Sequence, residues 1–169
     1  SSHKDKNFDT NWKNSKKAGI TTGAYHFMSF ESPGVDQAKN YIKTVPKEKD
    51  SLPPVVDFEY YGKFEKNHPS QETVDKILKP LLKKLKDHYG KDPIIYVNSN
   101  MYKKYISGKY KNRIWLADLK APKKLPDGRS WEFLQYSFNS KLTKYAGGIP
   151  HLDLNVFRGS RFSFAAKYL

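Results

Sequence analysis

The chain has no cysteine, and this absence removes several kinds of site. Without thiols there can be no disulfide, no thiolate zinc site and no cysteine nucleophile. Long apolar runs are also absent, since none approaches the roughly 18 residues that a membrane span requires. The sequence therefore predicts no membrane-spanning segment, and we expect no membrane partner.

Acidic residues are scarce relative to basic ones. Asp and Glu number 17 against 31 Lys and Arg, which leaves a net charge of +14. Such a surface attracts polyanions, and nucleic acids, anionic membranes and anionic cell-wall polymers all qualify. A lysine-rich surface that only keeps the protein soluble fits equally well. Charge alone therefore does not choose a partner.

Several familiar motifs are missing as well. No GxGxxG, Walker A or GxSxG pattern occurs, and the five histidines have no HExxH or comparable spacing. The sequence therefore predicts no metal site and no cofactor. It also has no recognisable recognition helix or RNP-like motif, so we do not expect a nucleic-acid partner.

What is present is an alternation of short apolar strands with helical patterns, typical of an α/β fold with a parallel sheet. The length suits one domain over residues 1–169 without a linker. We expect Ser32 to cap a helix that has Pro33 at its first position, and Pro80 to kink a longer one. The patterns predict helices at 8–17, 32–45, 70–89 and 100–106, and strands at 20–30, 52–60, 92–98, 113–119, 130–138 and 151–157.

The stretch LPPVVDFEYYG, residues 52–62, ends an apolar run with two acids. In a strand, residues two apart share a face, so Asp57 and Glu59 lie together with Cα atoms about 6.5–7 Å apart. Carboxyl oxygens within about 5 Å of each other are typical of one class of glycoside hydrolases. Repulsion and burial would keep one acid protonated beside an ionised partner. The alternative is a plain polar strand end, with or without a loosely held cation.

Two other strands carry polar candidates. In GAYHF, Tyr25 and Phe27 face one side and His26 the other. His26 could be a base or a metal ligand, or a hydrogen-bonded core histidine. In HLDLNVF, Asp153 alternates with leucines and is either a cleft residue or a buried, hydrogen-bonded one. Spacing does not separate these alternatives.

The order of the motifs carries more information than any one of them. AGITTGAYHF, LPPVVDFE, PIIYVN, IWLA, LQYS and LDLNVFRG follow one another along nearly the whole chain. Together they resemble family 25 glycoside hydrolases, the Chalaropsis-type lysozymes or N-acetylmuramidases. The resemblance implies a modified TIM-like (β/α)5β3 barrel that needs no metal. It also implies hydrolysis of the β-1,4 bond between N-acetylmuramic acid and N-acetylglucosamine in peptidoglycan.

The resemblance also assigns roles. It makes Glu59 the general acid, and it gives Asp57 the task of positioning the substrate's acetamido group or stabilising oxocarbenium charge. Asp153 matches a further cleft aspartate. The residues that match the sugar groove, or that stand beside such a residue in the same motif, are Tyr25, His26, Tyr96, Trp115, Gln135 and Tyr136.

Two departures from the family pattern stand out. Leu134 stands where the family usually has Trp, a contact that is lost or supplied by Trp131. The start, SSHKDKNF, resembles the segment that follows the family's second strand. We therefore expect a barrel that is incomplete at the N-terminus and lacks one active-site aspartate. Exposed sheet edges would favour a homo-oligomer, a domain swap or a separately supplied N-terminal fragment.

The leading hypothesis is a glycosidase of the lysozyme type that acts on bacterial peptidoglycan and is attracted to anionic wall polymers. We expect it to be secreted, located at the cell wall, or used as a phage endolysin. The alternative is a remnant of the same fold that binds wall glycans without catalysis.

Overall fold

The computed structural model describes residues 2–141 and 152–169. These residues form one six-stranded sheet whose strands follow one another in chain order. The first five run parallel and the sixth runs antiparallel to the fifth. The strands are β1 (Tyr25–Phe27), β2 (Val55–Asp57), β3 (Ile94–Asn98), β4 (Ile114–Ala117), β5 (Phe133–Ser140) and β6 (Leu152–Phe157).

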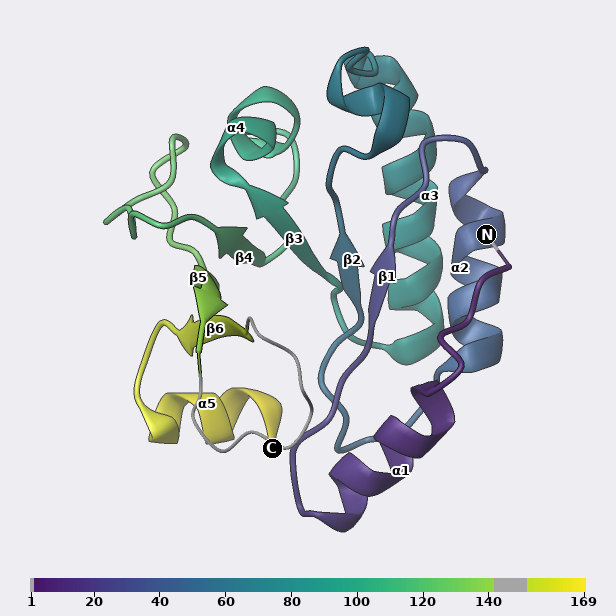
Figure 1. Cartoon of the computed structure of the whole chain (residues 1–169), viewed down its shortest axis with the longest axis vertical. Coiled ribbons are helices and arrows are strands. Elements are labelled where there is room, and N and C mark those ends of the chain that lie inside the picture. Colours follow the sequence, from purple (N-terminus) through teal and green to yellow (C-terminus); the bar gives the residue numbers. More distant parts are fainter. Residues whose placement is uncertain (1, 142–151) are drawn as a thin grey trace.

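The sheet curls without closing, so the expected α/β fold with an incomplete TIM-like barrel is confirmed (Figure 1). The helices alternate with the early strands, and fewer accompany the late ones. They are α1 (Phe8–Lys17), α2 (Gly34–Thr44), a 3-10 turn (Gly62–Glu65), α3 (Gln71–Tyr89), α4 (Ser99–Met101) with a following π turn (Tyr102–Ile106), and α5 (Arg161–Tyr168).

The predicted helix boundaries hold where the chain has strong end signals. The Ser70 hydroxyl accepts a hydrogen bond from the Thr73 amide at the start of α3, and Gly90 ends the helix at φ +69°. Pro80 lies inside α3, which continues through it as one helix. The chain also forms α5, which the sequence analysis did not predict, behind a cap by Ser160.

The predicted start of α2 was wrong. The helix begins at Gly34, and Pro33 precedes it in an extended conformation with ψ 137°. No side chain caps this end, so Ser32 is not the N-cap. Its carbonyl instead accepts a hydrogen bond from the Gln37 side chain, which turns back onto the segment before the helix.

The core lies between the outer face of the sheet and helices α2 and α3, which stand together beside β1 and β2 (Figure 1). Gly34 lets the two helices approach, since a Cβ there would lie 1.9 Å from the Ile77 carbonyl oxygen. The outer strand positions that supply this core are Val56, Phe58, Ile95, Val97 and Leu116. Their strand neighbours therefore point to the inner face, where the polar candidates lie.

Candidate active site

The pairing register lines up one level of side chains across the inner face of the sheet. Phe27 pairs with Asp57, and Asp57 pairs with Tyr96. The level then continues through aromatic residues on the next three strands, Trp115, Phe133 and Phe157. Because paired residues share a face, a carboxyl group stands in this row between aromatic side chains.

Asp57 is the last residue of β2 and is largely buried. Its Oδ1 atom has no hydrogen-bond partner among the described residues. Burial, and after it the charge of Glu59, raises the pKa of Asp57 to about 7. This carboxyl group therefore holds its proton over most of the range up to neutral pH.

Glu59 follows two residues later and is half-buried. Burial raises its pKa too, with the charge of Asp153 as the next cause. Asp57 and Glu59 thus both have raised pKa values, whereas the sequence predicted one raised pKa beside an ionised partner. The larger elevation falls on Asp57, which is the more buried of the two.

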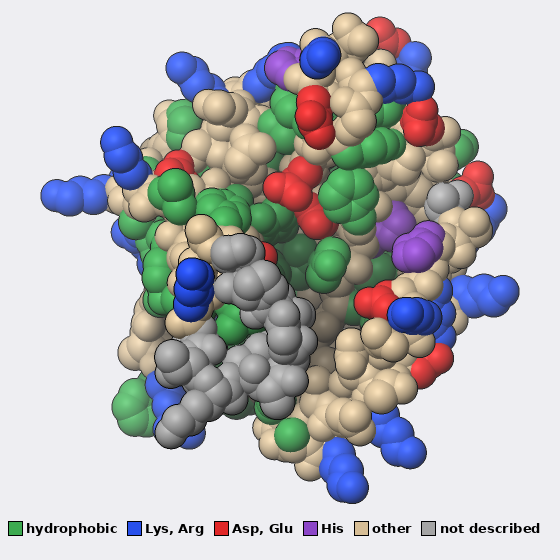
Figure 2. All heavy atoms as spheres, in the orientation of Figure 1, with side chains coloured by type: hydrophobic (Ala, Val, Ile, Leu, Met, Phe, Trp, Pro, Cys, Tyr) green, Lys and Arg blue, Asp and Glu red, His purple; other side chains and the backbone are tan. Residues whose placement is uncertain are grey.

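Asp153 lies on β6 at an exposed position, yet its charge reaches Glu59. It contributes to the raised pKa values of Glu59, Tyr25 and Tyr96. The charge of Glu59 thus acts on Asp57, and the charge of Asp153 acts on Glu59. Figure 2 shows acidic side chains near the centre of the face, beside hydrophobic side chains that border a hollow.

Aromatic side chains form the floor next to these acids. The rings of Tyr96 and Trp115 meet edge to face, with centroids 5.3 Å apart. The Trp115 Nε1 donates a hydrogen bond of 2.9 Å to the Oδ1 of Asn155. Asn155 was not predicted as a functional residue, although its position two residues after Asp153 already placed it on the same face.

The two β5 candidates differ in their surroundings. Gln135 is only 5% exposed and pairs with Ala117 and Asn155 on the inner face. Tyr136 is 43% exposed and falls at an irregularity in the β5–β6 pairing, so the register does not assign it to the row. Its contact with substrate stays a prediction.

The structure shows where Leu134, which replaces the family's usual tryptophan, and nearby Trp131 lie. Leu134 is buried in the core behind the sheet. Trp131 is also buried, and its Nε1 donates to the Pro122 carbonyl while Arg158 covers its ring. Trp131 is therefore held in the loop before β5. Of the two alternatives, the structure supports loss of the groove contact rather than its replacement by Trp131.

Residues 1–144 match the family described as Glycosyl hydrolases family 25. The chain belongs to this family. Its fold closely resembles that of a family 25 glycosyl hydrolase from Bacillus anthracis, with a TM-score of 0.92 and 40% identity over 100% of this chain and 79% of the other. A bacterial lysozyme from Streptomyces coelicolor gives a TM-score of 0.80 at 25% identity, over 98% of this chain and 80% of the other.

A curated relative of this family 25 chain is the uncharacterized protein YegX of Escherichia coli strain K12. The two are 31% identical over 158 residues, which is 92% of this chain and 55% of YegX. The chain thus spans about half the length of the curated relatives it matches. In the part of the chain that the structure describes, no helix is long and apolar enough to cross a membrane.

His26 of this family 25 chain faces α2 rather than the acids. Gln37, fully buried on α2, donates through Nε2 to the Ser29 and Ser32 carbonyls. Its Oε1 accepts from the Ser29 amide, so the 2.9 Å contact with His26 Nε2 requires the proton to be on that nitrogen. Burial lowers the pKa of His26. Of the two alternatives, the structure supports the hydrogen-bonded core histidine.

A cleft of about 820 Å³ runs along β1 beside the acid group. Its lining includes Asp57, together with Tyr25 and Phe27, which are 66% and 45% exposed. Residues 3–5, α1 and α2 supply the surrounding walls. The inner face is therefore open on its β1 side, next to the most perturbed carboxyl group.

The alternative in which the acid pair holds a cation finds no additional ligand. Among residues 2–141 and 152–169, no three His, Asp or Glu side chains are grouped as a metal site would require.

Proposed function

We propose that this chain is a peptidoglycan hydrolase of the muramidase type. It would cleave the β-1,4 bond between N-acetylmuramic acid and N-acetylglucosamine. The observation that carries the proposal is the group of Asp57, Glu59 and Asp153 on the inner face of a family 25 fold, with raised pKa values on the first two.

In this proposal Glu59 is the proton donor to the leaving glycosidic oxygen. Its raised pKa keeps part of the population protonated where an ordinary glutamate would be ionised. Asp57 positions the acetamido group of the substrate, or supports developing oxocarbenium charge once its own proton is lost. Asp153 adds negative charge on the opposite side of the site.

The groove residues would hold the sugar. Tyr96 and Trp115 offer aromatic faces on which sugar rings can stack, while Gln135 and Asn155 supply amide groups for hydroxyls. Tyr25 would contribute from β1, where its ring is exposed. His26 would act indirectly, by tying β1 to α2.

The test is loss of turbidity of a peptidoglycan suspension. We expect Glu59→Gln to reduce the rate by at least about a hundredfold, because removal of a general acid typically costs that much. Glu65→Gln, an exposed change in the 3-10 turn, is the matched control and should keep the parent rate. Circular dichroism would verify that both variants fold. Parent-level activity in Glu59→Gln would contradict the proposed role.

A second candidate is a wall-binding protein without catalysis. Two observations favour it. The site is open on its β1 side, and the Asp57 Oδ1 atom has no hydrogen-bond partner among the described residues. Sedimentation of the parent chain with peptidoglycan, without any loss of turbidity, would support this candidate. In both cases we infer an action on the cell wall, as a secreted protein or a phage lytic protein.

A further inference from the structure

The positive charge of the chain is concentrated in its later part. Residues 1–98 contain 17 Lys and Arg against 13 Asp and Glu, a net charge of +4, whereas residues 99–169 contain 14 against 4, a net charge of +10. The densest stretch is residues 103–124, which has eight basic residues and Asp118 as its single acid. Solubility does not require this concentration, because evenly spread charge would serve it equally well.

The two connections that carry this charge lie against each other. They are residues 99–113, between β3 and β4, and residues 118–132, between β4 and β5. The Asp127 carboxylate of the second accepts hydrogen bonds from the first, from the Tyr102 hydroxyl at 2.7 Å and the Gly108 amide at 3.2 Å. In Figure 1, α4 and the loop after β4 stand at the left of the molecule, and lysine and arginine side chains project from that side in Figure 2.

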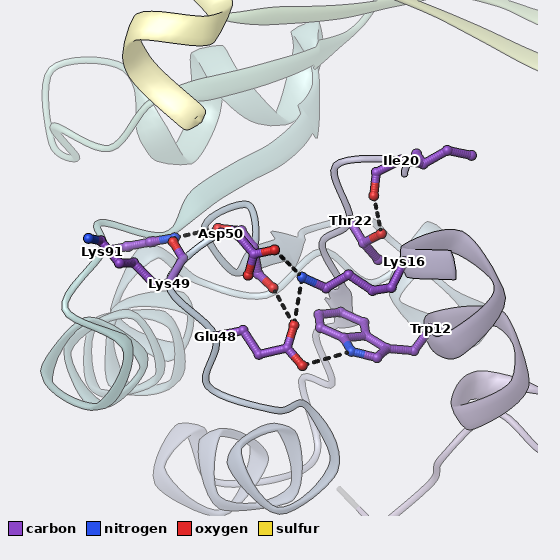
Figure 3. Close-up of polar contacts among 9 residues, drawn as sticks. Trp12, Lys16, Ile20, Thr22, Glu48, Lys49, Asp50 and Lys91 are labelled. Atoms are coloured by element: carbon purple, nitrogen blue, oxygen red, sulfur yellow. Dashed lines mark hydrogen bonds and ion pairs between the residues drawn. The ribbon is translucent and has the colours of Figure 1, made fainter. Parts of the chain in front are cut away.

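Seven exposed lysines of this surface have no carboxylate partner within the described part of the chain. They form the lysine patch: Lys103, Lys104, Lys109, Lys111, Lys120, Lys123 and Lys124. By contrast, eight of the 17 lysines in residues 1–98 form ion pairs. Lys16 forms two of them, 2.7 Å from Glu48 and 2.8 Å from Asp50 (Figure 3). The lysine patch thus presents charge that the protein itself does not neutralise.

The one acid of the stretch is engaged at the rim of the candidate active site. Asp118 directly follows β4, and its Oδ1 accepts a hydrogen bond of 2.9 Å from the Lys120 amide. Its Oδ2 accepts from the Ser99 hydroxyl, the first residue after β3. These bonds join the ends of the two strands that carry Tyr96 and Trp115. The lysine patch therefore begins at the rim of the proposed sugar groove.

The residue type indicates which anions fit the lysine patch. An ammonium group binds phosphate as a point charge, whereas planar, two-pronged contacts to carboxylates or bases favour arginine. Arg113 is the one arginine between residues 103 and 124, and its guanidinium group lies over the ring of Tyr168, 5.6 Å from the centroid. Helix α4 has three residues, too few to act as a recognition helix in a DNA groove. These features favour a flexible chain of phosphate groups over a nucleic acid duplex.

We propose that the lysine patch docks a cell-wall polymer whose polyol units are linked by phosphodiesters. The choice of a wall polymer rests on the proposed function, whereas the docking itself needs no catalysis. Phosphates of the polymer would take the place of counterions around the lysines, and release of these counterions would favour binding. The bound polymer would hold the protein at the wall while the groove stays free for the glycan.

The experiment measures the binding of end-labelled poly(glycerol phosphate) to the 169-residue chain by fluorescence anisotropy. One variant removes five charges of the lysine patch, and a matched variant removes five exposed, unpaired charges from residues 1–98. The patch changes are Lys103→Gln, Lys111→Gln, Lys120→Gln, Lys123→Gln and Lys124→Gln, and the matched changes are Lys6→Gln, Lys13→Gln, Lys43→Gln, Lys49→Gln and Lys66→Gln. Because only phosphates in contact release counterions, we expect at least about tenfold weaker binding by the patch variant and less than about a threefold change in the matched one. Circular dichroism verifies that both fold.

Four results would overturn the proposal. Absence of polymer binding by the parent would contradict it directly, and equal weakening in both variants would show that net charge, rather than the lysine patch, attracts the polymer. Equally tight binding of poly-glutamate would remove the preference for phosphate, and tighter binding of duplex DNA would identify a nucleic acid as the partner. Turbidity of polymer-free peptidoglycan is recorded separately, so a chain that binds the polymer without hydrolysis would contradict the hydrolase and leave this proposal intact.

Discussion

At the scale of single residues, the ionised form of Asp57 lowers the stability of the folded state. A carboxyl group that is mostly buried and has an unpartnered oxygen is costly to ionise. The folded pKa of about 7 lies above the ordinary value of 3.8, so the folded state binds this proton more tightly than the unfolded state does. Stability from this group is present at acidic pH and is lost as the pH rises towards 7.

Asp57→Asn should therefore stabilise the protein more at pH 8 than at pH 5. Each pKa unit corresponds to about 1.4 kcal/mol, so the gain at pH 8 is at most about 4 kcal/mol. Urea unfolding at both pH values measures it. Asp87→Asn, on the exposed side of α3, is the control and should change stability by less than about 0.5 kcal/mol. A gain that is the same at both pH values would contradict the assigned pKa.

Sequence reasoning works for residues when the relation is local. The shared face of Asp57 and Glu59 follows from a spacing of two residues, and the family resemblance brought Asp153 to the same site. The sequence alone could not reveal that Gln37 fixes the position of the His26 proton, because this contact joins a strand to a helix 11 residues away. Nor could it divide the pKa elevation between the acids, since burial depends on the complete fold.

At the scale of elements, the contact between α2 and α3 depends on a missing side chain. Gly34 lies against the backbone of α3, where a Cβ would meet the carbonyl of Ile77 and the amide of Leu81. Backbone atoms on a core helix cannot move aside as the tip of a side chain can. The start of α2 is thus determined by packing and not by a capping side chain.

Gly34→Ala should destabilise the protein by about 1–3 kcal/mol, which is typical of overpacking. The change would otherwise favour the helix, so a loss isolates the steric term. Thermal unfolding measures it, with Val35→Ala on the exposed side of the same helix as the control. Equal melting temperatures for Gly34→Ala and the parent would contradict this prediction, because α2 and α3 would then accommodate the added methyl group without loss of stability.

The elements themselves were predicted unevenly. Helices α1 and α3 carry strong periodicity, and α3 also has Ser70 and Gly90 at its ends, so their limits could be predicted. The strands were predicted too long, because apolar residues continue into loops while the ladder extends only where a neighbour pairs. β1 has three residues for this reason, although its apolar pattern covers residues 20–30.

At the scale of the whole molecule, the alternation of strands and helices predicted a parallel sheet, and the first five strands are parallel. Their order, which was not predicted, follows the chain. The resemblance also predicted an incomplete barrel, and the open, curled sheet agrees. Self-association through its edges remains a prediction. Net charge is a property of the same scale, and lysine and arginine side chains are spread around the rim of the face in Figure 2.

The +14 charge should make wall binding sensitive to salt. Raising NaCl from 50 to 500 mM shortens the Debye length severalfold and lowers the gain from counterion release, so we expect binding to Gram-positive walls to weaken at least about tenfold. Sedimentation with intact walls measures this effect. Walls stripped of teichoic acids are the control and should show little salt dependence. Unchanged binding to intact walls would argue against an anionic partner.

The Lys16 contacts with Glu48 and Asp50 have a consequence for motion. Helix α1 is joined to the body by a partly exposed ion pair network and two half-buried rings, Phe8 and Trp12, whereas α3 buries six side chains. Opening α1 therefore requires much less free energy than unfolding the protein. The helix can detach as a separate cooperative unit while the sheet stays folded, and its amide hydrogens would exchange on that faster timescale.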